Sequence, residues 1–127
     1  MGNLEKVNST DIVRAIHNSD LTDPLFEKIF LIESTIAGTH YVENIKKIEP
    51  NLKVGDRLDF YREPNNSHDE KAILVKHRGD KIGYVPRVDN EILANLMDAG
   101  KLLYGELSYK NYEGDWLRID FDIYLED

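Results

Sequence analysis

Hydrophobic residues fall at every second position near the C-terminal end of the chain. This period of two is typical of a β-strand that buries one face. It predicts a closing hairpin whose strands cover 102–112 and 116–125, with a turn at 113–115. The residues that carry the pattern are Leu117, Ile119, Phe121 and Ile123.

The middle of the chain contains further strand patterns. Leu58 and Phe60 alternate with charged neighbours and predict a strand over 57–62. Residues 72–77 are rich in apolar and β-branched types, and Arg78-Gly79-Asp80 predicts a hairpin turn into a returning strand at 81–85. A first strand is expected between Phe26 and Ile36.

One stretch changes from a period of two to helical spacing. Ile92, Leu93, Leu96 and Met97 predict a helix over 90–98, and Gly100 is placed to end it. We expect this helix to close one end of the fold. The residues expected mainly inside are Phe60, Ile73, Val75, Ile82, Leu93, Leu96, Ile119 and Phe121.

The first part of the chain differs from the rest. A short helix is predicted after the capping residues Ser9 or Thr10, and the Asp23-Pro24 step marks a boundary. We therefore expect an N-terminal helical extension over 1–25 and one domain over 26–127.

Composition limits the classes of protein that the chain can belong to. The 127 residues suit a single core, and the absence of cysteine excludes disulfides and thiolate zinc sites. No apolar run is long enough to cross a membrane and no signal peptide is visible, so we expect a cytoplasmic protein without a membrane partner. The net charge of -8 argues against a long nucleic-acid footprint. Residues 36–90 nevertheless hold ten Lys and Arg against nine acids, whereas residues 91–127 hold three against nine.

Three short blocks hold the candidate chemistry. The first runs from Ile36 to Tyr41, the second from Arg62 to Ile73, and the third from Ile82 to Arg87. In the second block, Pro64 is followed by polar residues that can hydrogen-bond nearby backbone and fix an irregular turn. Those polar residues are Asn65, Asn66, Ser67 and Asp69.

Together, in this order, the three blocks resemble the HIRAN domain over about residues 26 to 127. The resemblance implies a mainly β fold with minor α: a small six-stranded antiparallel barrel, OB-like or SH3-like, with one or two short helices. It also implies a DNA-repair module that binds the 3′ end of single-stranded DNA without a cofactor. A protein partner such as a helicase or a nuclease would fit this role. No Gly-x-x-x-x-Gly-Lys-Ser/Thr motif is present, so recognition is expected rather than translocation.

The resemblance carries roles over to particular positions. Asp69 matches the acid that accepts a hydrogen bond from the 3′-hydroxyl, and Tyr41 matches an aromatic that packs on the terminal nucleotide. Tyr84 and Arg87 match positions that touch backbone phosphates, and Asn66 fits the loop motif. Two positions depart from better-studied members: His40 stands in place of an arginine and His68 in place of a tyrosine. The residues expected to bind DNA are therefore His40, Tyr41, Asn66, His68, Asp69, Tyr84 and Arg87.

Other interpretations of the same residues remain open. Asp69 can simply brace its own turn, Tyr41 can be half-buried packing, and Arg87 can be a solvated surface residue. A protein-interaction module on the same barrel, with little DNA affinity, is the main alternative, and the acidic C-terminal hairpin favours it.

A metal site or an active site ranks lower. His40, His68, His77 and Asp69 are types that bind zinc, but no His-x-x-x-His spacing is present. Adjacent residues such as Ser67, His68 and Asp69 cannot easily align as nucleophile, base and orienting group. We therefore expect neither a metal nor an enzyme.

Overall fold

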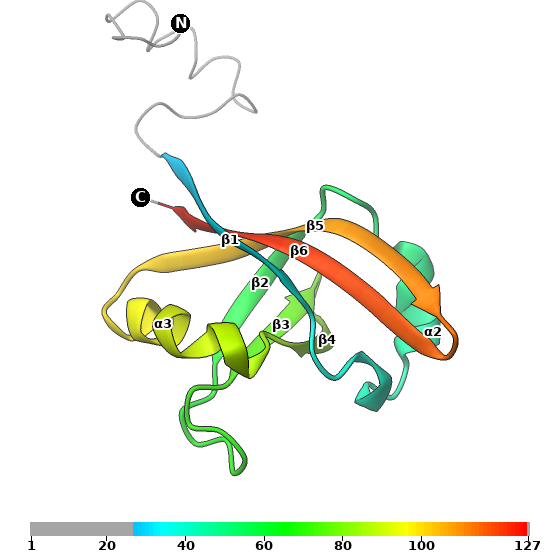
Figure 1. Cartoon of the computed structure of the whole chain (residues 1–127), viewed down its shortest axis with the longest axis horizontal. Coiled ribbons are helices and arrows are strands. Elements are labelled where there is room, and N and C mark those ends of the chain that lie inside the picture. The colour runs from blue at the N-terminus through cyan, green and yellow to red at the C-terminus, as the bar shows by residue number, and fades with distance from the viewer. Residues whose placement is uncertain (1–26, 127) are drawn as a thin grey trace, which may run out of the picture.

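The computed structural model describes residues 27–126, and the chain forms one curved antiparallel sheet with helices at its ends (Figure 1). The predicted helix near Ser9 and the extension over 1–25 lie outside the described residues. The strands are β1 (Lys28–Thr35), β2 (Arg57–Arg62), β3 (Ile73–His77), β4 (Asp80–Tyr84), β5 (Leu102–Glu113) and β6 (Trp116–Glu126). The helices are the 3₁₀ turn η2 (Thr39–Tyr41), α2 (Ile45–Ile48), the 3₁₀ turn η3 (Glu49–Asn51) and α3 (Arg87–Asp98).

The six strands are in the order β1-β6-β5-β2-β3-β4, and every neighbouring pair is antiparallel. The prediction of a mainly β, six-stranded antiparallel fold with short helices is confirmed. The resemblance implied a closed barrel, and this part of the prediction is not confirmed: the hydrogen-bonded ladder stays open between β1 and β4. Its two outer strands approach each other at one isolated bridge, between Ala37, just after β1, and Tyr84 at the end of β4.

Alternation of side chains builds the core in the way the sequence predicts. The four residues of the C-terminal pattern are all buried, and so are seven of the eight expected core residues. Leu96 is only partly buried, because it lies toward the end of α3 and packs at the margin of the core. No helix among residues 27–126 is both long and apolar enough to cross a membrane.

The helices differ more from prediction than the strands do. Helix α3 begins at Arg87, three residues before the expected start, with the extended Pro86 as its N-cap. Gly100 follows the helix as predicted, with its N–H bonded to the Met97 carbonyl. Helix α2 was not predicted; it has only four residues and none of them is buried, so it leaves no apolar period.

Candidate nucleic-acid interface

The loop between β2 and β3 is fixed by its own polar side chains. The Oδ1 atom of Asn66 accepts hydrogen bonds from the backbone N–H groups of His68 (2.8 Å) and Asp69 (3.1 Å). Its Nδ2 atom donates to Glu63 at 2.9 Å. The expected bracing of the turn is confirmed for Asn66 and Asp69. Within the described part of the chain, no such side-chain bond is found for Asn65 or Ser67.

A partly buried arginine, Arg62, joins this loop to helix α3. The Arg62 guanidinium donates to the carbonyls of Ala72 (2.7 Å) and Glu70 (3.0 Å). It also forms a two-point contact with the Asp98 carboxylate, at 2.9 and 3.2 Å. A planar guanidinium suits such a set of acceptors because its N–H groups diverge in fixed directions. Arg62 therefore holds the loop against the last turn of α3. The loop projects below this helix in Figure 1.

Asp69 lies where the loop meets the beginning of α3. Its Oδ1 accepts from the Lys71 backbone N–H at 2.9 Å, and its Oδ2 accepts from the buried Asn90 side chain at 2.7 Å. These two bonds, the backbone bond first, hold the pKa of the Asp69 carboxyl below its usual value, and Arg87 adds to the effect. Asp69 thus braces its own turn and stays ionised at neutral pH. A carboxylate has about four acceptor positions, so it retains capacity for a further donor.

Arg87 is the first residue of α3 and lies over the same loop. Its Nη2 donates to the His68 carbonyl at 2.6 Å, and its Nε is 3.6 Å from Asp69 Oδ2. The side chain is still 72% exposed. A guanidinium carries five N–H donors, so most of them remain available to a ligand.

Tyr84 connects strand β4 to the loop. Its hydroxyl donates to Glu63 at 2.8 Å, and burial together with this contact raises its pKa to about 12. The neighbouring Gly83 permits a very close approach of chain segments. A Cβ on Gly83 would stand 2.4 Å from Ile36 Cγ2 and 2.5 Å from the Ala37 carbonyl oxygen. Residues 36–37 therefore pack directly on β4, which brings the following η2 turn beside Tyr84.

The η2 turn presents two rings to solvent. The His40 and Tyr41 rings lie 4.1 Å apart at 37°, and Tyr41 is 83% exposed. Thr39 anchors the turn because its buried hydroxyl donates to the Leu117 carbonyl at 2.7 Å. The Tyr41 ring is thus an exposed aromatic surface on a fixed backbone, and it does not pack into the core.

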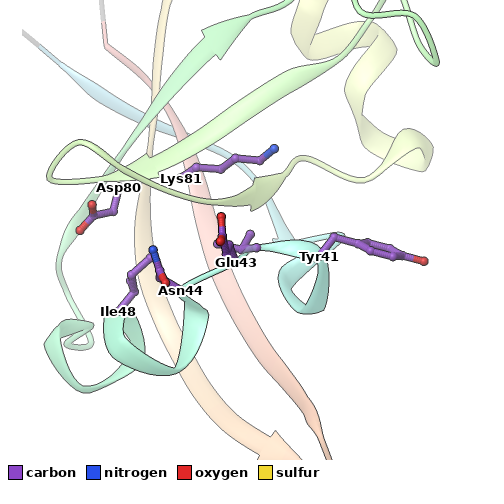
Figure 2. Close-up of a pocket in the computed structure, with 7 residues that line it drawn as sticks. Tyr41, Glu43, Asn44, Ile48, Asp80 and Lys81 are labelled. Atoms are coloured by element: carbon purple, nitrogen blue, oxygen red, sulfur yellow. The ribbon is translucent and has the colours of Figure 1, made fainter.

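A depression of about 380 Å³ lies beside Tyr41, between the η2–α2 segment and the beginning of β4. Figure 2 shows the Tyr41 ring at its outer end, while Glu43 and Asn44 lie across from the strand that carries Lys81. The lining also includes Ile48 and Asp80. Two carboxylates against one ammonium make this depression unfavourable for a phosphate.

The structure brings five of the seven expected residues into one hydrogen-bonded chain. It runs from Tyr84 through Glu63 to Asn66, and from there to His68, Asp69 and Arg87. His40 and Tyr41 form a separate pair. The bridge from Ala37 to Tyr84 connects this pair to the hydrogen-bonded series of residues. Sequence reasoning missed two supporting residues, Asn90 and Glu63.

His77 lies away from this group. Its ring is buried and bonds to Asp56 Oδ2 at 2.8 Å. The described residues contain no group of three His, Cys, Asp or Glu side chains arranged to hold a metal ion.

Comparison with known proteins agrees with the motifs. Residues 29–126 match the family model of the HIRAN domain. The chain belongs to the HIRAN domain family. A crystal structure of a protein from Lactobacillus plantarum is similar to this HIRAN domain, with a TM-score of 0.75 and 28% identity over 80% of this chain and 98% of that one. The crystal structure of the HIRAN domain of human HLTF has a TM-score of 0.62 and 17% identity, over 78% of each chain. A search of the curated proteins finds no match.

Proposed function

We propose that this HIRAN domain binds the 3′ end of single-stranded DNA and holds the terminal nucleotide in a pocket. The observation that carries the proposal is the contact between Arg87 and Asp69, 3.6 Å apart at the junction of the loop and α3. The Arg87 guanidinium, which can bind a phosphate, therefore lies beside the Asp69 carboxylate, which can accept a hydrogen bond from a hydroxyl group. The residues proposed to line the pocket are His40, Tyr41, Asn66, His68, Asp69, Tyr84 and Arg87.

Asp69 supplies selectivity for a free 3′-hydroxyl in this proposal. Its lowered pKa keeps it ionised, and an ionised carboxylate is a strong acceptor from O–H. The same charge repels a phosphate group attached at that oxygen. Because Asn90 and Lys71 fix both carboxylate oxygens, the acceptor is already oriented before DNA arrives.

Arg87 contacts the last internucleotide phosphate in this arrangement. It is the first residue of a twelve-residue helix whose N-cap, Pro86, makes no side-chain cap hydrogen bond. N–H groups in the first turn of a helix are directed outward and favour an anion, which supports a phosphate near Arg87.

Tyr41 stacks on the terminal base in the proposed complex. Stacking on an aromatic contributes about 1–3 kcal/mol per base without reading the sequence. The acidic depression on the far side of Tyr41 disfavours phosphates, so the strand should leave the pocket on the side of Arg87. A binding role of this kind requires no catalysis by this chain, and a helicase or nuclease partner would act on the bound end.

Fluorescence anisotropy with labelled single strands tests the proposal. We expect tighter binding of a strand with a 3′-hydroxyl than of the same strand with a 3′-phosphate. Asp69→Asn should remove most of this preference, because it removes the charge while keeping an acceptor for the Lys71 N–H. Asp115→Asn, an equal change in the exposed β5–β6 turn, is the matched control and should keep the preference.

Equal binding of both strands by the native protein would contradict the proposal. A preference that survives in Asp69→Asn would contradict the role of Asp69 alone. The first outcome would count against binding of a free 3′ end, and the second only against the role of Asp69 in it.

A protein-interaction module remains the second candidate, and the β5–β6 hairpin favours it. Tyr109 and Trp116 are partly exposed there, with Glu113 and Asp120 close by. Aromatic residues with a polar rim are typical of protein interfaces. Absence of any DNA binding, together with capture of a partner that Trp116→Ala abolishes, would favour this function.

A further inference from the structure

Strand β1 is at one end of the sheet, and none of the strands within residues 27–126 covers its outer edge. It pairs with β6 alone, and among the described residues no other strand meets its opposite edge before the bridge at Ala37. Ile29 and Phe30 on this strand are 38% and 54% exposed. An exposed edge with apolar side chains can template the addition of another strand.

A bulge between Phe30 and Ile32 sets the faces of this edge. Lys28 is opposite Glu126 and Glu33 is opposite Asp122, so both side chains lie on the outer face of the sheet. Without the extra residue, positions 28 and 33 would lie on opposite faces. For the same reason Ile29 and Ile32 both face inward, opposite Leu125 and Ile123.

The six residues from Lys28 to Glu33 are complementary to themselves when the direction is reversed. Antiparallel pairing of two copies sets Lys28 against Glu33, Ile29 against Ile32 and Phe30 against Leu31. From this we propose that the free edge of β1 binds the same edge of a second copy across a two-fold axis. The two Lys28–Glu33 pairs then lie on the outer face of the sheet and the two Ile29–Ile32 pairs on the inner face, because the bulge directs these side chains to those faces.

The acidic side chains near the edge of β1 also favour a second copy of the chain as the binding partner. Glu33 lies directly opposite Asp122, and like charges in that position destabilise a sheet. Neither carboxylate has an ion-pair partner among residues 27–126, although Lys28 has Glu106 at 2.7 Å. The partner's Lys28 would bring a positive charge to Glu33 and relieve this repulsion.

The interface is short, so the association should be weak. Six residues per copy bury less than the roughly 1,200 Å² of a standard stable interface. We expect monomers at low concentration and dimers, of twice the 14.7 kDa chain mass, at high concentration. Sedimentation velocity of the full chain between roughly 5 and 500 µM covers the range where such weak dimers form.

Charge reversal across the edge gives the sharpest test. Lys28→Glu and Glu33→Lys should each weaken dimerisation at least tenfold, and the double variant should restore it. Glu106→Gln removes the contact of Lys28 within one copy and should leave the dimer intact. Lys46→Glu makes the same charge change on the exposed α2 and is the second control. Hydrogen exchange should show protection that rises with concentration for those amides of residues 28–33 that point away from β6.

Three results would overturn the proposal. A monomer at every concentration would do so, and so would a dimer that survives both single reversals. The third is failure of the double variant to dimerise although it unfolds like the native chain. If those amides of 28–33 that point away from β6 are equally protected at every concentration in a monomer, the edge is covered by residues of the same chain, such as the segment before Lys28.

Discussion

Gly83→Ala tests most directly how residues 36–37, which follow β1, pack against β4. The new Cβ would lie 2.4 Å from Ile36 Cγ2 and 2.5 Å from the Ala37 carbonyl oxygen. Carbon atoms normally pack about 3.5–4.0 Å apart, so the two segments would have to separate by about 1 Å. Gly83 also has a φ of +150°, which disfavours any side chain.

Two costs add in this variant. Overpacking costs about 1–3 kcal/mol, and an unfavourable positive φ costs about 1–2 kcal/mol. The free energy of unfolding should therefore fall by about 2–5 kcal/mol, and the midpoint of thermal unfolding by about 8–20 °C in a domain of this size. Because residues 36–37 lead into η2, we also expect weaker stacking of DNA on Tyr41.

Gly79→Ala is the matched control. Gly79 has a φ of +89°, but a Cβ there would meet no atom within 4 Å. It should cost only the backbone part, about 1–2 kcal/mol. Urea unfolding followed by circular dichroism measures both variants. If Gly83→Ala loses no more stability than Gly79→Ala, the close approach of β4 to residues 36–37 is wrong.

Three further predictions concern side chains around the fold. The log of DNA affinity should fall with log salt at a slope of about 1–2, and Arg87→Ala should reduce that slope by about 0.7; an unchanged slope would remove Arg87 from the phosphate path. Arg62→Lys keeps the charge but loses the divergent donors, so unfolding in urea should show a loss of about 1–3 kcal/mol and hydrogen exchange should show faster opening of residues 63–72. The hydrogen bond from His77, buried in the core, lowers the pKa of Asp56 below 3.8. The stabilisation by ionised Asp56 is present above pH 3.8 and is lost as the pH falls through the lowered pKa. Asp56→Ala should therefore cost about 1.5–3 kcal/mol at pH 7 and flatten the acid-induced loss of stability, which a pH series of urea melts would show.

Most of the sheet could be predicted from the sequence because its pattern has a strict period. The strand over 57–62 has the expected bounds. Both strands of the closing hairpin start where expected and end one residue later. The early start of α3 could not be seen, because Val88 in its first turn is 88% exposed and adds nothing to an apolar stripe. Whether the ladder closes depends on how far β1 and β4 twist toward each other, and residue types do not encode this distance.

The candidate site was predictable as a set of motifs but not as a set of contacts. Asn66 and Asp69 follow local turn chemistry, which short sequences reveal. The bond from Asn90 to Asp69 joins a helix to a loop 21 positions earlier, and no local period indicates it. Arg62 fitted the motif, yet its role as the link between the loop and Asp98 requires knowledge of where α3 ends.

In the function proposed above, a DNA end is held between the η2 turn and the junction of the loop with α3. Titration of the ¹⁵N-labelled protein with a short single strand ending in a 3′-hydroxyl, followed by amide chemical shifts, tests this residue by residue. We expect the largest shifts to cluster at residues 40–41, 66–69 and 84–87, and a strand with a 3′-phosphate to produce smaller shifts. Shifts concentrated on the β5–β6 hairpin, or none at millimolar DNA, would contradict the proposed function.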